Sequence, residues 1–129
     1  MPTFSENHAD FLKGRVFAHL ATIMPDGSPQ VTPVWIDFDG EHLLINTAEG
    51  RAKDRNMRRD GRVALSIMNP DQPYRHVDIR GHVAEIIHDG ADEHIDTLSR
   101  RYDNTPWTYK PGQVRVIFKI AADSVTGEL

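Results

Sequence analysis

Six runs of strand-type residues, separated by residues that favour turns, recur along this 129-residue chain and restrict its fold more than any other feature. The runs cover residues 16–24, 30–38, 41–47, 62–69, 74–88 and 113–120. Asp39-Gly40 is a hairpin signal between the second and third runs, and Gly81 interrupts the longest run where a strand of that length bulges or bends. Many short strands with few helices predict a mainly β fold, built as a small antiparallel barrel.

Helices are predicted in the segments between these runs. They cover residues 5–13, 51–59 and 91–102, and residues 104–112 form an irregular link. Ser5 is positioned to cap the first helix, and Asp60-Gly61 ends the second. The third is expected to be an exposed helix.

Composition limits the classes of protein to which the chain can belong. Its length fits one domain spanning residues 1–129, and the absence of cysteine excludes a disulfide framework, a thiol nucleophile and a thiolate metal site. The sequence begins with no targeting signal, and no apolar run approaches the ~20 residues of a membrane span, so we expect a cytoplasmic protein without a membrane partner. A net charge of -4 argues against a general nucleic-acid binder.

The local motifs of common hydrolases, P-loop enzymes and zinc peptidases are missing from the sequence. The seven histidines show no spacing typical of metal ligands, so no metal site is expected. The sequence therefore assigns a catalytic role to no residue, and the catalytic residues are unknown at this level.

A cationic stretch, EGRAKDRNMRRDGR at residues 49–62, stands out in a chain of negative net charge. Its cations are Arg51, Lys53, Arg55, Arg58, Arg59 and Arg62. Arg51 and Lys53 fall in the first turn of the predicted helix, where free N–H groups and the helix dipole already favour an anion, so cations there indicate a bound phosphate. The four distal arginines have two interpretations: a solvated face on which Asp54 pairs with Arg58, or a continuation of the anion site.

A proline and several aromatic residues lie where they could contact a planar ligand. Pro33 removes a hydrogen-bond donor from its strand, so the strand is either at the edge of the sheet or open to a ligand. Trp35, on the same strand, either fills the core or contacts a ligand, and Trp107 and Tyr109 lie in the irregular link. A planar cofactor laid against this strand, with its phosphate on the cationic helix, would use both features.

Three stretches, in this order and spacing, resemble the pyridoxamine phosphate oxidase-like family of split β-barrel flavoproteins. They are LATIMPDGSPQVTPVW, LLINTAEGRAKDRNMRRDGRVALSI and YRHVDIRGHVAEI, and the match is most specific in the block R-x-K-x-x-N-[LM]-R-R-D-x-R. Within this family, the chain is most similar to a branch of probable deazaflavin-dependent enzymes. The resemblance implies a six-stranded antiparallel split barrel of the FMN-binding type that forms a homodimer, with coenzyme F-420 or FMN in a groove between the protomers.

The resemblance also implies three kinds of cofactor contact. Arg51 and Lys53 would hold the phosphate, and residues 33–35 would flank the ring. Parts of the 74–80 strand and of the 104–112 link from the partner protomer would close the groove. The full cofactor-binding set expected from the resemblance is Gln30, Pro33, Val34, Trp35, Asn46, Thr47, Arg51, Lys53, Arg58, Tyr74 and Trp107.

The function implied by the resemblance is that of an oxidoreductase that passes hydride from reduced coenzyme F-420 to a small conjugated or heterocyclic acceptor. An FMN-dependent oxidoreductase of the same family and a non-catalytic flavin or deazaflavin carrier are the alternatives. Because F-420 continues beyond its phosphate into a tail of glutamates, the four distal arginines are expected to favour it over FMN. The sequence lacks the C-terminal segment with which pyridoxamine phosphate oxidases hold their substrate, so vitamin B6 chemistry is not expected.

Overall fold

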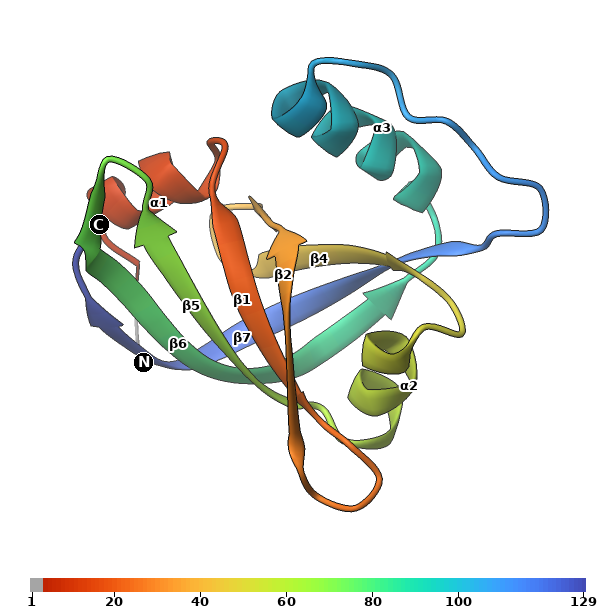
Figure 1. The fold of residues 1–129 in the computed structure, drawn as a ribbon, viewed down its shortest axis with the longest axis horizontal. Helices are drawn as coiled ribbons and strands as arrows, with labels where there is room; N and C mark the ends of the chain where they lie inside the picture. Colours follow the sequence, from red (N-terminus) through yellow and green to blue (C-terminus); the bar gives the residue numbers. More distant parts are fainter. Residues whose placement is uncertain (1–3) are drawn as a thin grey trace.

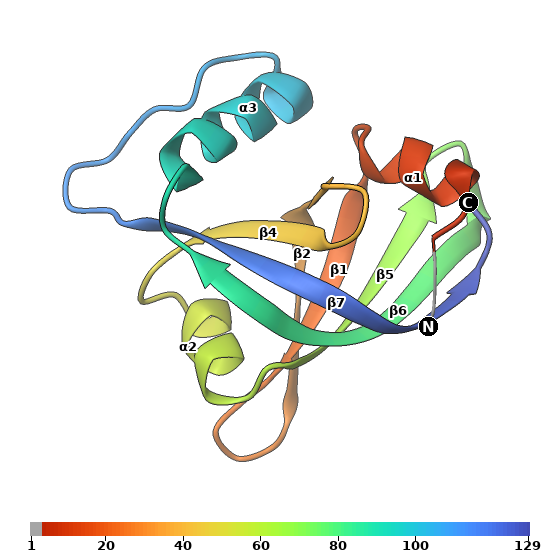
Figure 2. The ribbon, with the colours of Figure 1, turned by 180° about the vertical axis from the view of Figure 1, so that it is seen from behind.

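The computed structural model describes residues 4–129, which form a curled antiparallel sheet with three helices (Figure 1 and Figure 2). The strands are β1 (Phe17–Ile23), β2 (Pro29–Trp35), β3 (Asp37–Phe38), β4 (Leu43–Ala48), β5 (Arg62–Asn69), β6 (Gln72–Ile87) and β7 (Arg115–Gly127). The helices are α1 (Glu6–Leu12), α2 (Ala52–Arg59) and α3 (Ala91–Asp103). Within the described residues the sheet has the strand order β2-β1-β5-β6-β7-β4-β3, which confirms the mainly β prediction.

The sheet curls because its longest strand, β6, pairs with β5 over its first part and with β7 over its last part. Figure 1 and Figure 2 both show β6 and β7 crossing the molecule side by side. The register between them shifts at Gly81, where the sequence predicts a bulge or a bend. A Cβ atom at Gly81 would overlap the carbonyl oxygen of Ala121, so this close approach of two strands requires glycine.

The predicted second strand, residues 30–38, is divided into β2 and β3 at Ile36. The Ile36 N–H donates to the Tyr102 hydroxyl at 3.2 Å, and the same hydroxyl lies 2.9 Å from the Ile36 carbonyl oxygen. A side chain from α3 therefore takes the place of a strand partner. For this reason the sheet of the described residues has seven strands rather than the six that were expected.

The core lies inside the curl, and α1 covers one end of it. Its buried strand residues include Ala18, Leu20, Leu43, Ile45, Leu65, Ile67, Val77, Ile79, Val116, Phe118 and Ile120. The predicted cap of α1 is confirmed, because the Ser5 hydroxyl oxygen accepts from the His8 N–H at 3.1 Å. β7 begins at Arg115 and extends beyond the predicted range of 113–120, so Val114 lies outside the strand and is half exposed.

α2 and α3 lie at the other end of the molecule, on either side of the ends of β4 and β7 (Figure 1). The side of α2 that faces β1 carries Met57, which is buried in the core, and Asn56. Asn56 Nδ2 donates to Thr22 Oγ1 on β1 at 3.0 Å. These contacts fix the orientation of α2 and therefore the position of its N-terminus.

α3 differs from the exposed helix that the sequence predicts over 91–102. Its residues Ile95, Leu98 and Tyr102 follow a helical period and are at most 2% exposed. They form a second apolar cluster, against which Trp35 and Trp107 pack. Among the described residues, no helix has the length and apolar character needed to cross a membrane.

Candidate functional site

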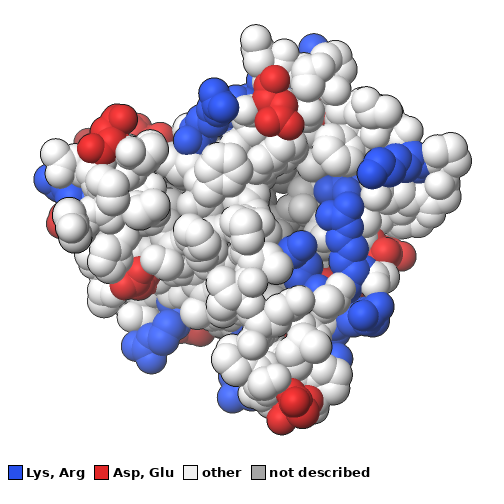
Figure 3. All heavy atoms as spheres, viewed as in Figure 1, with Lys and Arg blue, Asp and Glu red and all other residues white. Residues whose placement is uncertain are grey.

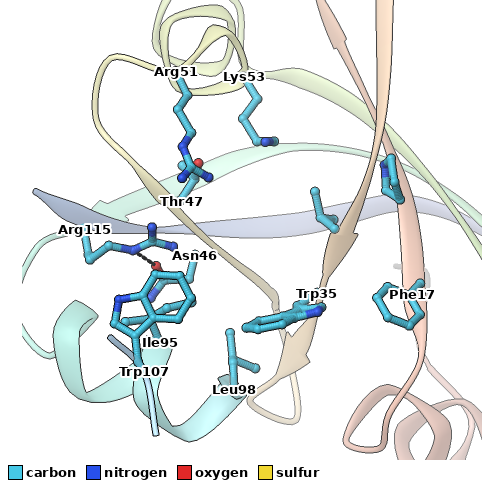
Figure 4. Close-up of a pocket in the computed structure, with 12 residues that line it drawn as sticks. Phe17, Trp35, Asn46, Thr47, Arg51, Lys53, Ile95, Leu98, Trp107 and Arg115 are labelled. Atoms are coloured by element: carbon cyan, nitrogen blue, oxygen red, sulfur yellow. Dashed lines mark hydrogen bonds between the residues drawn. The ribbon is translucent and has the colours of Figure 1, made fainter. Parts of the chain in front are cut away.

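A cavity of about 320 Å³ lies between the N-terminus of α2 and the buried face of α3 (Figure 4). It is lined by Phe17, Pro33, Val34, Trp35, Asn46, Thr47, Arg51, Lys53, Ile95, Leu98, Trp107 and Arg115. In Figure 4, Arg51 and Lys53 project from α2 at one end, whereas Trp35 and Phe17 lie across the cavity. The cavity therefore has a positively charged part and an aromatic part, on a scale suited to a small-molecule site.

The turn from β4 into α2 places the cations at the cavity. Gly50 has a φ of 91°, in the left-handed region that favours glycine. Its N–H donates to Asp54 Oδ2 at 2.9 Å, so the carboxylate of the first helical turn bonds to the loop before the helix. Arg51 is the N-cap residue of α2, and its side chain makes no capping bond and extends toward Thr47 (Figure 4).

Arg51, Lys53 and Arg115 line the cavity, and no carboxylate of residues 4–129 lies within ion-pair distance of these three cations. Burial lowers the pKa of Lys53, and the charges of Arg51 and Arg115 lower it further. Burial, and then the charge of Arg51, also lower the pKa of Arg115 to about 10. Figure 3 shows Lys and Arg side chains gathered around a hollow between α2 and α3. An anion bound there would relieve the repulsion between these cations.

Two buried polar atoms in the cavity wall have no hydrogen-bond partner among the described residues. They are Thr47 Oγ1 and Trp107 Nε1. Thr47 is only 1% exposed, and buried hydroxyls in folded proteins nearly always have a partner. An anionic oxygen of a ligand would supply the missing acceptor for the Thr47 hydroxyl.

The aromatic part of the cavity is held in place by packing with α3. The Trp35 ring stacks on Tyr102 with a centroid distance of 5.2 Å and an interplanar angle of 12°. Trp107 meets Trp35 edge to face at 6.4 Å. Pro33 lies on β2, which is an end strand of the sheet, so both alternatives for this proline hold: its strand is an edge, and its side chain faces the cavity. The result is a fixed, flat apolar wall that suits a planar ring.

Eight of the eleven residues expected to bind cofactor line the cavity. They are Pro33, Val34, Trp35, Asn46, Thr47, Arg51, Lys53 and Trp107. Three of the expected residues lie elsewhere. Gln30 Oε1 accepts from Asn56 Nδ2 at 3.4 Å, between α2 and the β1–β2 hairpin, and Tyr74 is 97% exposed near the start of β6. Arg58 Nε donates to Asp54 Oδ1 at 2.8 Å, on a side of α2 that does not line the cavity.

The ion pairs of α2 favour the solvated-face interpretation of the distal arginines. Besides its bond to Asp54, Arg58 lies 3.3 Å from a carboxylate oxygen of Glu49, and Arg62 pairs with Asp60 at 2.7 Å. The expected surplus of positive charge is therefore partly neutralised by neighbouring carboxylates of the same chain. Sequence spacing suggested the Asp54 pair, because residues four apart share a helix face.

The structure adds residues to the site that the sequence does not predict. Arg115 comes from β7, Phe17 comes from β1, and Ile95 and Leu98 come from α3. Arg115 is only 5% exposed, its Nε donates to Asn46 Oδ1 at 3.0 Å, and its guanidinium carbon lies 5.1 Å from the centre of a Trp107 ring. In the sequence, Arg115 alternates with apolar residues as a solvent-facing strand residue would. No local signal indicates that its side chain is buried in a cavity. Within residues 4–129, no three His, Asp or Glu side chains gather as metal ligands would.

Known proteins with the same fold identify the relatives of this chain. A family model described as pyridoxamine 5'-phosphate oxidase matches residues 4–127. A solved structure described as an F-420 reductase is 35% identical to this chain, with a TM-score of 0.84, and the match covers 95% of this chain and 98% of the other. A conserved hypothetical protein from Mycobacterium tuberculosis is 28% identical, with a TM-score of 0.74, over 98% of this chain and 85% of the other. The resemblance noted in the sequence is confirmed: the chain has the split-barrel fold and belongs to the pyridoxamine 5'-phosphate oxidase family.

Proposed function

We propose that this protein is an oxidoreductase that binds coenzyme F-420 in the cavity and passes hydride from the reduced cofactor to a small conjugated or heterocyclic acceptor. One observation carries the proposal: cations without a carboxylate partner within residues 4–129, and the hydroxyl of Thr47, which has no hydrogen-bond partner among the same residues, lie beside a flat aromatic wall. A planar cofactor with a phosphate group satisfies both parts of this cavity. The chemistry supplied by such a cofactor when bound is hydride transfer.

The residues present fit the phosphate of this cofactor. Arg51 and Lys53 would supply charge-assisted hydrogen bonds, and Thr47 would donate its hydroxyl proton. The first-turn N–H groups of α2, which have no acceptor within the helix, point in the direction that favours an anion. Pro33 and Trp35 would flank the ring system.

The protein's own contribution is binding, orientation and the exclusion of water. Among residues 4–129, those that line the cavity include no Asp, Glu, His or Tyr, so this part of the chain supplies no conventional general acid or base apart from the cations. This composition suits an enzyme in which the cofactor carries the reaction and the acceptor stacks beside it.

Coenzyme F-420 is proposed over FMN because of the 35% identity to a protein described as an F-420 reductase. FMN presents the same terminal phosphate, so it is the natural competitor in every binding experiment. The pairing of Arg58 and Arg62 with neighbouring carboxylates leaves fewer free cations for a glutamate tail. We therefore expect F-420 to bind more tightly than FMN by a smaller margin than the number of arginines alone suggests. This margin in affinity should shrink as the salt concentration is raised.

A symmetric homodimer would complete this site. Phe17 lines the cavity and is 50% exposed, and Val31 on the neighbouring edge strand is 59% exposed. Apolar side chains of this size beside a cofactor cavity are suitable for burial against a second protomer. Sedimentation equilibrium tests this part separately: a monomer that binds the cofactor with full affinity would contradict it.

The test begins with cofactor-free protein and parallel fluorescence titrations with F-420 and FMN. Lys53→Ala removes one charge-assisted contact and should weaken F-420 binding about ten- to a hundredfold. Lys13→Ala is the matched control, because Lys13 is an exposed lysine at the C-terminus of α1, outside the cavity. It should bind F-420 as the unaltered protein does.

Steady-state assays then separate the alternatives. Reduced F-420 should be oxidised faster when the protein and a conjugated or heterocyclic acceptor are both present. Tight binding without turnover over a broad acceptor panel would identify a carrier instead of an enzyme. FMN binding at least tenfold tighter than F-420 at low salt would identify a flavoprotein.

A further inference from the structure

A chain of hydrogen bonds connects Arg115 in the cavity to the carboxylate of Asp37 on β3. Arg115 Nε donates to Asn46 Oδ1 at 3.0 Å, and Asn46 Nδ2 lies 3.1 Å from His94 Nδ1. The chain ends at Asp37, whose Oδ2 lies 3.0 Å from His94 Nε2. Its four members belong to β7, β4, α3 and β3, so one polar path joins four elements of the fold.

The chemistry of the partners fixes the direction of each bond in the chain. Asn46 Nδ2 also donates to the carbonyl oxygen of Ala91 at 2.9 Å, and a carbonyl can only accept. The Asn46 amide nitrogen therefore faces His94, and His94 Nδ1 must accept. A neutral imidazole has one N–H, so His94 Nε2 carries the proton and donates to Asp37. Every donor in the chain then points toward Asp37.

Asp37 is a suitable end for this chain because it is held as a carboxylate. Burial alone would raise the pKa of Asp37, but hydrogen bonds from His94 and Arg101 outweigh burial and keep the pKa well below its usual range. Arg101 NH1 donates to Asp37 Oδ1 at 2.8 Å. With both oxygens bonded, the carboxylate holds one rotamer and so orients the ring of His94.

We propose that Asn46, His94 and Asp37 are positioning residues, and that they hold Arg115 as a third cation of the anion site. The proposal rests on the proposed function only in taking the physiological anion to be the cofactor phosphate. It also changes the role expected for Asn46. Because its oxygen is bonded to Arg115 and its nitrogen to Ala91 and His94, Asn46 acts on the ligand through Arg115.

The geometry of Arg115 explains why such positioning is needed. Of its five N–H donors, the Nε–H bonds to Asn46 and one on NH1 makes a longer bond of 3.4 Å to Gln113, which leaves three for a ligand. The positive charge of Arg51 repels the Arg115 guanidinium from the cavity side, and the negative charge of Asp92 attracts it. Without the bond to Asn46, the side chain would be expected to turn away from Arg51.

A double-mutant cycle tests the proposal with two probes, inorganic phosphate and coenzyme F-420. Arg115→Ala should weaken phosphate binding about tenfold because it removes one cation of the site. His94→Ala should weaken it about fivefold, because His94 acts on phosphate through Arg115. In the Arg115→Ala background, His94→Ala should change the affinity less than about twofold, since the residue that it positions is gone. Equal losses from His94→Ala in both backgrounds would overturn the proposal, as would unchanged phosphate affinity in Arg115→Ala.

Two further variants separate positioning from folding. His94→Gln keeps an acceptor for Asn46 and a donor for Asp37, so it should recover most of the affinity lost in His94→Ala. His82→Ala removes an exposed histidine that lies at the same 3.0 Å from a carboxylate oxygen, in this case that of Asp123, and should leave phosphate binding unchanged. If His94→Gln binds phosphate as weakly as His94→Ala, His94 does not act through the chain.

A measurement without ligand completes the test. Nitrogen NMR of His94 should show an unprotonated Nδ1 and a protonated Nε2, and a protonated Nδ1 would contradict the bond direction. The double-mutant cycle with inorganic phosphate tests this proposal independently of the proposed function. Coupling seen with phosphate but no binding of F-420 would remove F-420 as the cofactor and leave the positioning chain in place.

Discussion

The hydroxyl of Tyr102 ties α3 to the junction of β2 and β3, and its removal gives a prediction with a calculable size. It accepts from the Ile36 N–H at 3.2 Å and lies 2.5 Å from the carbonyl oxygen of Val16. Tyr102, Ile36 and Val16 are all at most 4% exposed. Tyr102→Phe therefore leaves a buried donor and a buried acceptor without partners, while the packing of the ring is unchanged.

The expected loss of stability follows from these two groups. A buried polar group without a partner costs about 1–3 kcal/mol, so two such groups predict a fall of about 2–6 kcal/mol in the free energy of unfolding. For a chain of this length the corresponding fall in Tm is about 7–20 °C. Because Trp35 stacks on the same ring, a loosened α3 should also weaken cofactor binding.

Urea denaturation followed by tryptophan fluorescence measures this effect, since Trp35 and Trp107 both pack on the α3 cluster. The control is Tyr109→Phe. The Tyr109 hydroxyl donates to the Asp92 carbonyl oxygen at 3.0 Å, but this tyrosine is 55% exposed and water can replace the bond. Tyr109→Phe should therefore change the free energy of unfolding by less than about 0.5 kcal/mol. A loss equally small for Tyr102→Phe would refute the assignment of the hydroxyl as the tie between α3 and the strands.

Other predictions concern the bulge and the cavity cations. Gly81→Ala should destabilise the protein by more than about 2 kcal/mol in thermal denaturation, whereas Gly61→Ala, whose Cβ would meet Val83 at an ordinary 3.5 Å, should be tolerated. Arg51→Gln should raise Tm in the absence of ligand and weaken phosphate binding, and both effects should shrink with added salt. The pKa of Arg115 is lowered to about 10, so the folded state binds fewer protons than the unfolded state above that pH. The destabilisation caused by this lowered pKa is fully present at neutral pH and is lost as pH rises past about 10. In chemical denaturation, the free energy of unfolding of the unaltered protein should therefore rise relative to that of Arg115→Met above about pH 10.

Much of the fold is determined by local sequence. Alternating apolar residues and turn residues define the strands, because these properties act within a few neighbouring residues. Local sequence also places Arg51 and Lys53 at the start of α2, and the missing N–H of Pro33 is consistent with its position on an edge strand. Gly81 likewise marks its own bulge, since only a residue without a Cβ allows the approach of Ala121.

The cavity, in contrast, is decided by the tertiary structure. Arg115 bonds to Asn46, which lies 69 positions earlier in the chain, and Trp107 packs against Trp35. No local pattern indicates which strand or link will face α2. The break at Ile36 depends on Tyr102, which is 66 residues away. That no carboxylate of residues 4–129 pairs with Lys53 also depends on how the sheet curls. Local periodicity determines which face of an element is buried, but the register and curvature of the whole sheet determine what that face meets.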